Sequence, residues 1–287
     1  MTDQAKGLLI TSLAVLLVIP ESLLVRLFDA HPFTILFWRS FTLSISTGIW
    51  VLFVYGREGI ATWMKPSRYH VMYGGFNLIS AAMFIYAVTL TSVANTVFIL
   101  ASLPVFAAIF SRIFLGERVS LRLQVTIILV LIGVSIIAFG SDEQEGASLI
   151  GNLLAIGAAL FFAAALTTAR AARPLSIVPI VPAAFMVGAL LCLFITNPFA
   201  VTPAQYPIIV LHGGVLMAGA MILFAIGPRF ISSAEASLLI LGESIGAPLL
   251  VWAVLGEFPG QWTLVGGAMI LTTLIVSNVI ALRKAKK

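Results

Sequence analysis

Charged residues are scarce in this sequence. Asp, Glu, Lys and Arg make up 9% of its 287 residues, whereas about a quarter of the residues of a typical soluble domain are charged. Hydrophobic residues reach 61%, and the mean hydropathy is +1.13. This composition excludes a soluble globular domain, and it predicts an integral membrane protein whose main partner is the lipid bilayer.

Groups that would support redox, metal or ATP chemistry are also missing. The single cysteine, Cys192, excludes an intrachain disulfide framework. No His, Asp and Glu residues have metal-ligand spacing, and no Walker-type glycine-rich loop is present. We therefore expect no metal, no cofactor and no direct use of ATP.

One short motif resembles that of an enzyme. Residues 242–246 read Gly-Glu-Ser-Ile-Gly, which matches the G-x-S-x-G pattern of hydrolases. That pattern works at a turn from a strand into a helix, whereas here it interrupts a long apolar run. We expect the match to be accidental, and we expect the protein not to be an enzyme.

Apolar runs long enough to cross a bilayer recur along the chain, and no barrel-like alternation of apolar and polar residues appears. The sequence therefore predicts an all-α polytopic membrane protein. The first run resembles a signal peptide, but Glu21 interrupts it and no A-x-A-like cleavage site follows, so we expect a membrane span. The ten expected spans are 7–28, 33–55, 69–90, 93–115, 121–140, 148–169, 176–196, 205–226, 233–255 and 261–282.

Basic residues concentrate on one of the two sides that these spans define. With a cytoplasmic N-terminus, 14 of the 16 Lys and Arg residues fall on the cytoplasmic side, and only Arg26 and Arg39 do not. The positive-inside rule therefore predicts that both termini are cytoplasmic. The net charge of +5 reflects this asymmetry, so we expect no nucleic-acid partner.

The chain contains an internal repeat. A shift of 140 positions places Val93–Glu117 on Ser233–Glu257, and both segments end in Leu-Gly-Glu. We predict a first five-helix repeat over 1–140, an acidic outer linker over 141–147 and a second five-helix repeat over 148–287. Because five is odd, the second repeat enters the membrane upside down. Such inverted repeats are typical of secondary transporters with a site between the halves near the midplane.

Several motifs together carry a family resemblance. They are His31-Pro32, the sequence Phe37-Trp38-Arg39-Ser40, and the segment 100–108 (LASLPVFAA) that runs on to Leu-Gly-Glu at 115–117, with the same ending at 255–257. In this order the sequence resembles the EamA-type permeases of the drug/metabolite transporter superfamily. The resemblance implies a metabolite exporter of the inner membrane. It also implies a central cavity, with the fifth and tenth spans packed away from it.

The resemblance extends to the branch that exports aromatic and other amino acids. We therefore expect a small-molecule substrate, an amino acid, moved by alternating access. A broader drug or metabolite carrier is the alternative. A non-transporting membrane receptor or scaffold is a hypothesis from a different functional class. The sequence leaves the oligomeric state open.

Ionisable residues inside spans are costly, so each is a candidate for function. Glu21 and Arg39 lie at about the same depth on adjacent spans and can pair; they either join two helices or contact a substrate. Glu243, in the middle of the ninth span, is the best candidate for a carboxylate that takes up a proton or binds an ammonium group; the alternative is a neutral or hydrogen-bonded side chain that holds two helices together. His212 is either a proton carrier or a packing residue.

Polar and aromatic residues complete the expected substrate site. Amides and hydroxyls within spans either contact a substrate or join helices, and aromatic rings either line a cavity or face lipid. From these groups we take as candidates Asn77, Tyr86, Asn95, Trp38 and Phe161.

Overall fold

Helices form all the regular structure in the described part of the computed structural model, which comprises residues 3–116, 121–140, 148–172, 175–227, 230–231 and 233–285. For residues 170, 225, 233–238, 281 and 284–285 only the backbone is described. Glu117 of the first Leu-Gly-Glu motif and the predicted linker 141–147 lie outside the described residues.

The first half contains α1 (Asp3–Val18), α2 (Glu21–Leu27), α3 (Pro32–Met64), α4 (Arg68–Leu90), α5 (Val93–Leu100), α6 (Leu103–Leu115) and α7 (Leu121–Gly140). The expected first span, 7–28, is two helices, separated at Pro20. The expected fourth span, 93–115, is also two helices, because it breaks at Ala101 and Ser102. The helix of the second span continues past 55, and Gly56, at φ 50° and ψ −126°, turns its last part aside.

The second half contains α8 (Leu149–Ala171), α9 (Ile180–Cys192), α11 (Ala218–Ile226), α12 (Ser233–Leu255) and α13 (Gln261–Ala285). The expected eighth span, 205–226, changes its winding three times. A 3₁₀ turn, η2 (Pro203–Gln205), and the short α10 (Tyr206–Ile209) precede a π-helix, η3 (Val210–Met217), which leads into α11. The helix of the expected seventh span, 176–196, is only the 13 residues of α9.

Length and composition make this a multi-pass membrane protein. Eight helical segments of the described chain are long and apolar enough to cross a bilayer. Ile180–Cys192 and the stretch Leu239–Leu255 of α12 are shorter apolar helices. Ten crossings therefore remain the sequence's prediction.

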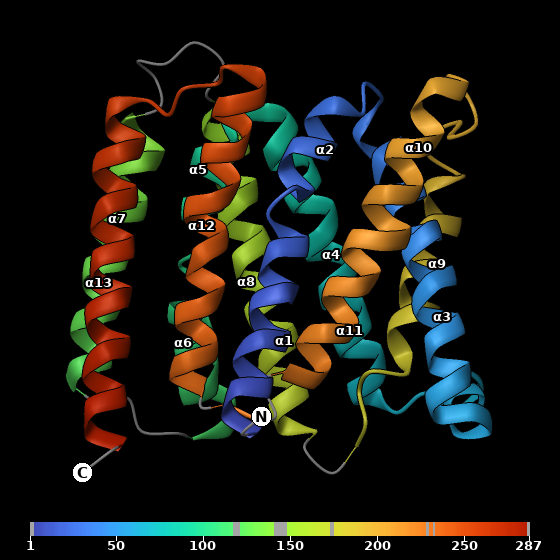
Figure 1. Ribbon diagram of the computed structural model, residues 1–287, viewed down its shortest axis with the longest axis horizontal. Coiled ribbons are helices and arrows are strands. Elements are labelled where there is room, and N and C mark those ends of the chain that lie inside the picture. The colour runs from blue at the N-terminus through green and yellow to red at the C-terminus, as the bar shows by residue number, and fades with distance from the viewer. Residues whose placement is uncertain are drawn as a thin grey trace.

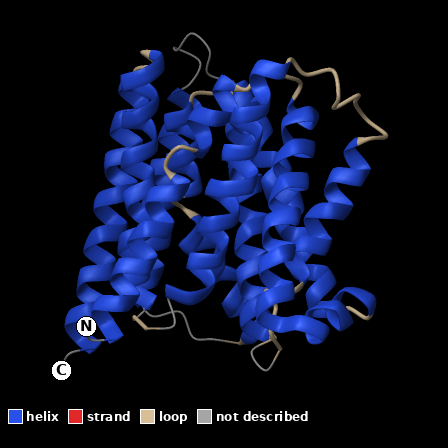
Figure 2. Ribbon diagram, turned by 45° about the vertical axis from the view of Figure 1, so that its right-hand side comes forward, coloured by secondary structure: helices blue, strands red, loops and turns tan. Residues whose placement is uncertain are grey.

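The helices stand side by side in one bundle (Figures 1 and 2). The helices α7 and α13 pack on each other at one edge, as the resemblance implied for the fifth and tenth spans, while α3 packs on α9 and α4 on α8. Helix α1 contacts α11 and α12. It begins at the end of the bundle where α13 finishes, and α2 lies at the opposite end, called the far end below (Figure 1).

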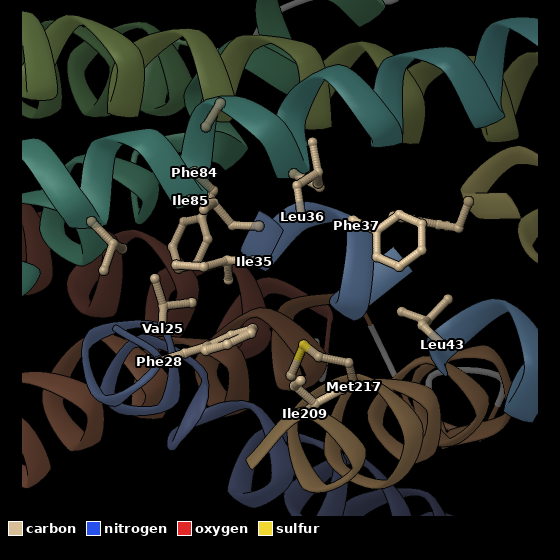
Figure 3. Close-up of a cluster of buried hydrophobic side chains, with 14 of the residues drawn as sticks. Val25, Phe28, Ile35, Leu36, Phe37, Leu43, Phe84, Ile85, Ile209 and Met217 are labelled. Carbon is tan, nitrogen blue, oxygen red and sulfur yellow. The ribbon is translucent and has the colours of Figure 1, made fainter. Parts of the chain in front are cut away.

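A hydrophobic core joins the two halves (Figure 3). Val25 and Phe28 from α2 and its end, together with Ile35 of α3, pack with Ile209 and Met217 from the second half. All five are at most 4% exposed. This core surrounds α2 and holds it between the halves.

The repeated Leu-Gly-Glu motif ends a helix in both halves. Gly116 follows α6 at φ 68°, and Gly256 follows α12 at φ 71°. Both angles are in the left-handed region that glycine tolerates best at a helix C-terminus. The repeated glycines therefore have the same structural role.

Candidate functional site

The broken first span places a carboxylate inside the bundle. Pro20 has no N–H group and cannot donate a helix hydrogen bond, so α1 ends before it. The amide of Leu24 donates to Pro20 O at 2.9 Å and starts α2. Glu21 is the first residue of this second helix and is only 6% exposed.

Glu21 forms the ion pair with Arg39 that the sequence predicted. Arg39 Nη2 on α3 donates to Glu21 Oε1 at 2.6 Å, and both side chains are about one-tenth exposed or less. The same Nη2 lies 3.6 Å from Met217 Sδ, and the guanidinium stands 6.0 Å from the ring centroid of Phe185. The pair connects α2 and α3.

Two of the three guanidinium nitrogens of Arg39 make no hydrogen bond among the described residues. Its Nε and Nη1 atoms are buried and have no hydrogen-bond partner among the described residues. Buried N–H groups without partners are costly and rare. These two atoms are donors that an anionic group could satisfy.

His212 reaches the pair from the second half. Its Nε2 lies 3.9 Å from Glu21 Oε1, and the residue is 2% exposed. His212 belongs to the π-helix η3, and π-helical turns are frequent at functional sites. The next residue, Gly213, lets η3 approach α3 closely, since a Cβ there would lie 2.5 Å from the carbonyl oxygen of Arg39.

Glu243 of α12 is the second carboxylate of the group. It is close enough to Glu21 for the two charges to interact, and the described residues provide no hydrogen bond or ion pair to it. Gly246, one turn further on, packs directly on Ile19 beside the break in the first span. Four of the predicted residues, Glu21, Arg39, His212 and Glu243, therefore form one group, called the charge cluster below. Glu21 and His212 are buried, whereas Arg39 and Glu243 are partly exposed.

The aromatic candidates Trp38 and Tyr86 lie elsewhere. Trp38 Nε1 donates to Pro198 O at 2.8 Å, and its ring packs against Phe199 on the link between α9 and η2. Tyr86 packs edge-on against His31 and Phe33 near the start of α3. Both rings join segments of the bundle, and neither side chain has a hydrogen bond or ring contact with the charge cluster among the described residues.

Three further candidates also have other partners. Asn77 donates to the carbonyl of Tyr73 in its own helix at 2.9 Å. Phe161 packs on Phe76, where α8 meets α4. Asn95 donates to Asn152 at 3.3 Å and accepts from Thr263, so its amide joins α5, α8 and α13. In these contacts Phe161 and Asn95 hold helices together, whereas Asn77 bonds within its own helix.

Sequence reasoning missed a second ion pair, at the far end. Arg26 Nη2 lies 3.3 Å from Glu257 Oε2 and also donates to Thr91 O at 2.8 Å. Glu257 accepts from the amide of Val93 at 2.7 Å. The sequence carried a signal for this contact, because Glu257 ends the second Leu-Gly-Glu motif and Arg26 is one of the two basic residues off the cytoplasmic side.

The described residues contain no group of three or more His, Cys, Asp or Glu residues that could hold a metal ion. The hydrolase-like residues Gly242–Gly246 lie inside helix α12, with Ser244 5% exposed, and not at a strand-to-helix turn.

Comparisons with known proteins give a family match to the first half of the chain and a fold match to the whole of it. The model of the EamA-like transporter family matches residues 6–139, just under half of the chain. One crystal structure, described only as that of a protein, superimposes with a TM-score of 0.68 at 19% identity, over 97% of this chain and 98% of that one. This similarity shows a shared fold across both halves. The comparison with curated proteins finds no match.

Proposed function

We propose that this protein is a secondary transporter that exports small amphipathic metabolites, amino acids in the first place, by alternating access. The observation that carries the proposal is the charge cluster, in which Glu21 and Arg39 of the first half meet His212 and Glu243 of the second half inside an apolar bundle. The match of the first half to the EamA-like transporter family supports it.

The helix contacts support an inverted repeat. With the helices counted as ten spans, an inverted repeat relates each span of one half to the span five positions along in the other half. The contact of the third span with the sixth, α4 on α8, then corresponds to the contact of the eighth span with the first, α11 on α1. The contact of the second span with the eighth, α3 on η3, becomes that of the seventh with the third, α9 on α4. All four contacts are present. In two further contacts, α3 with α9 and α7 with α13, the partners are the equivalent spans of the two halves, so the exchange leaves each contact unchanged.

Membrane orientation forms part of the proposal. The helix ends that carry Lys6, Arg68, Arg122 and Arg283 lie at the end of the bundle where α1 begins (Figure 1). The positive-inside rule assigns this end to the cytoplasm and the far end to the outside. The proposed location is the inner membrane of the cell, with both termini cytoplasmic.

The charges of the cluster suit a zwitterion. With His212 neutral, two carboxylates face one guanidinium, so the cluster has room for one further positive charge. A substrate ammonium group beside Glu243 and Glu21 would supply it, and the substrate carboxylate would bind the free Nε and Nη1 of Arg39. When no substrate is bound, a proton on Glu243 or His212 would supply this positive charge. Such an exchange would couple transport to the pH gradient.

Uptake into proteoliposomes of the purified protein tests this function. The panel contains labelled amino acids with aromatic, aliphatic, acidic and basic side chains, each measured with and without a pH gradient. We expect saturable uptake of several amino acids and a response to the gradient. Absence of uptake across the panel, in vesicles that retain folded protein, would exclude amino acids and favour a broader drug or metabolite carrier.

A further inference from the structure

We propose that α2 is a gate at the far end of the bundle, hinged at Pro20 and latched by Arg26 and Glu257. The gate rests on the proposed transport function, because a gate has meaning only for a protein that moves a substrate. It adds to that function by naming the element that opens.

The position of α2 separates the charge cluster from the far end. Its first residue, Glu21, is buried and belongs to the charge cluster, whereas the side chain of Arg26 in its last turn is 26% exposed. Five residues of α-helix span about 7.5 Å. The helix contacts α4 of the first half and η3 and α12 of the second half, so this one short element fills the space between the halves above the cluster.

The break at Pro20 separates the movement of α2 from that of α1. A continuous helix would have to tilt over its whole length, but at this position the hydrogen bond that residue 20 would donate is missing. Gly246 of α12 accommodates Ile19 at the break, where a Cβ would lie 2.6 Å from Ile19 Cδ1. The hinge therefore lies where the residue after α1 packs tightly on α12, and α2 extends beyond it.

The latch joins three segments that are distant in the sequence. Arg26 of α2 binds Glu257, which follows α12, and the carbonyl of Thr91, which lies between α4 and α5. Glu257 also accepts from the amide of Val93 at the start of α5. Because both charged side chains are about one-quarter exposed, water can replace each contact. The latch can therefore break and re-form during a transport cycle.

The two ends of α2 connect the cluster to the latch. A substrate carboxylate that binds Arg39 competes with Glu21, and an ammonium group that binds Glu21 competes with Arg39. Either event weakens the contact that holds the first turn of α2 to α3. Substrate in the site would thus favour release of the gate.

Accessibility of a cysteine inside the cluster tests the gate without any transport measurement. Cys192→Ala removes the only native thiol, and Met217→Cys places a new one beside Arg39. Purified protein in detergent is then treated with a sulfonated maleimide. We expect Arg26→Gln, and likewise Glu257→Gln, to raise the labelling rate several-fold over that of the parent protein, which carries only Cys192→Ala and Met217→Cys. Arg26→Lys, which keeps the charge, should stay near the parent rate.

The matched control is Arg57→Gln, because Arg57 is an exposed arginine that follows the Gly56 turn at the opposite end of α3. It should leave the labelling rate unchanged. The gate is refuted if Arg26→Gln and Glu257→Gln both label at the rate of the parent. Failure of the transport proposal is a separate result, since it appears only as absence of uptake into proteoliposomes.

Discussion

At the scale of single residues, the charge cluster is the most unusual feature of this chain. Charges inside a membrane bundle are costly and persist when they are paired or have a function. The sequence predicted the Glu21–Arg39 pair because the two residues are equally distant from the same turn. It did not predict that His212 and Glu243 join them, because depth along a span does not fix which way a side chain points or which spans are neighbours.

The buried ion pair should matter more for stability than its two charges would on a surface. Glu21→Gln or Arg39→Met leaves the partner charge buried and unpaired, which costs about 3–5 kcal/mol of the free energy of unfolding. The charge-swapped double variant Glu21→Arg/Arg39→Glu should lose less, because a pair is retained. Thermal unfolding of the purified variants in detergent measures the difference. Equal losses in all three proteins would argue that the pair does not hold α2 to α3.

At the scale of elements, irregular helices build the site. The break at Pro20 exposes the start of α2 to the cluster, and the π-helix η3 presents His212. Pro20 in the sequence explains the break, although the break itself was not predicted. The π-helix had no comparable signal, because its residues, Val210–Met217, are as apolar as those of a regular span. Helix α12 likewise runs on through Pro248, where the sequence would allow a break.

The approach of η3 to α3 depends on one glycine. In Gly213→Ala the new methyl group would overlap Thr42 Oγ1 and lie 2.5 Å from the carbonyl oxygen of Arg39. The helices would have to separate, which moves His212 away from Glu21. We expect a loss of about 1–3 kcal/mol in the free energy of unfolding, together with reduced uptake into proteoliposomes.

The adjacent glycine provides the control for this variant. A Cβ at Gly214 would meet no atom nearer than 3.5 Å, the distance to Ser46 Oγ, which is an ordinary contact. Gly214→Ala should therefore unfold and transport like the parent protein. If Gly213→Ala behaves in the same way as Gly214→Ala, close approach of the two helices is not needed for the site.

At the scale of the whole molecule, the proposed duplication would account for both the bundle and the place of the cluster between its halves. The repeated Leu-Gly-Glu motif was enough to predict two related halves and their order in the chain. Both motifs end helices at left-handed glycines, and the helix contacts exchange in pairs between the halves. Hydropathy located most spans, but it could not show where a span breaks or that the helix of the seventh is short.

The aromatic and amide candidates show the limit of reading a membrane sequence. Trp38, Tyr86, Asn77, Asn95 and Phe161 all pack or bond within the bundle. The same residue types line cavities and join helices, so composition alone does not separate the two roles. The ionisable residues carried more information because few structural roles justify the cost of burying them.

Glu243 is the residue on which the proposed transport site depends most directly. Its decisive test is uptake into proteoliposomes by Glu243→Gln, with Glu58→Gln as a control, because Glu58 is an exposed carboxylate that follows the Gly56 turn. We expect Glu243→Gln to lose most of the uptake and the response to a pH gradient, whereas Glu58→Gln keeps both. A Glu243→Gln protein with unchanged rate and pH dependence would contradict the claim that the charge cluster is the transport site.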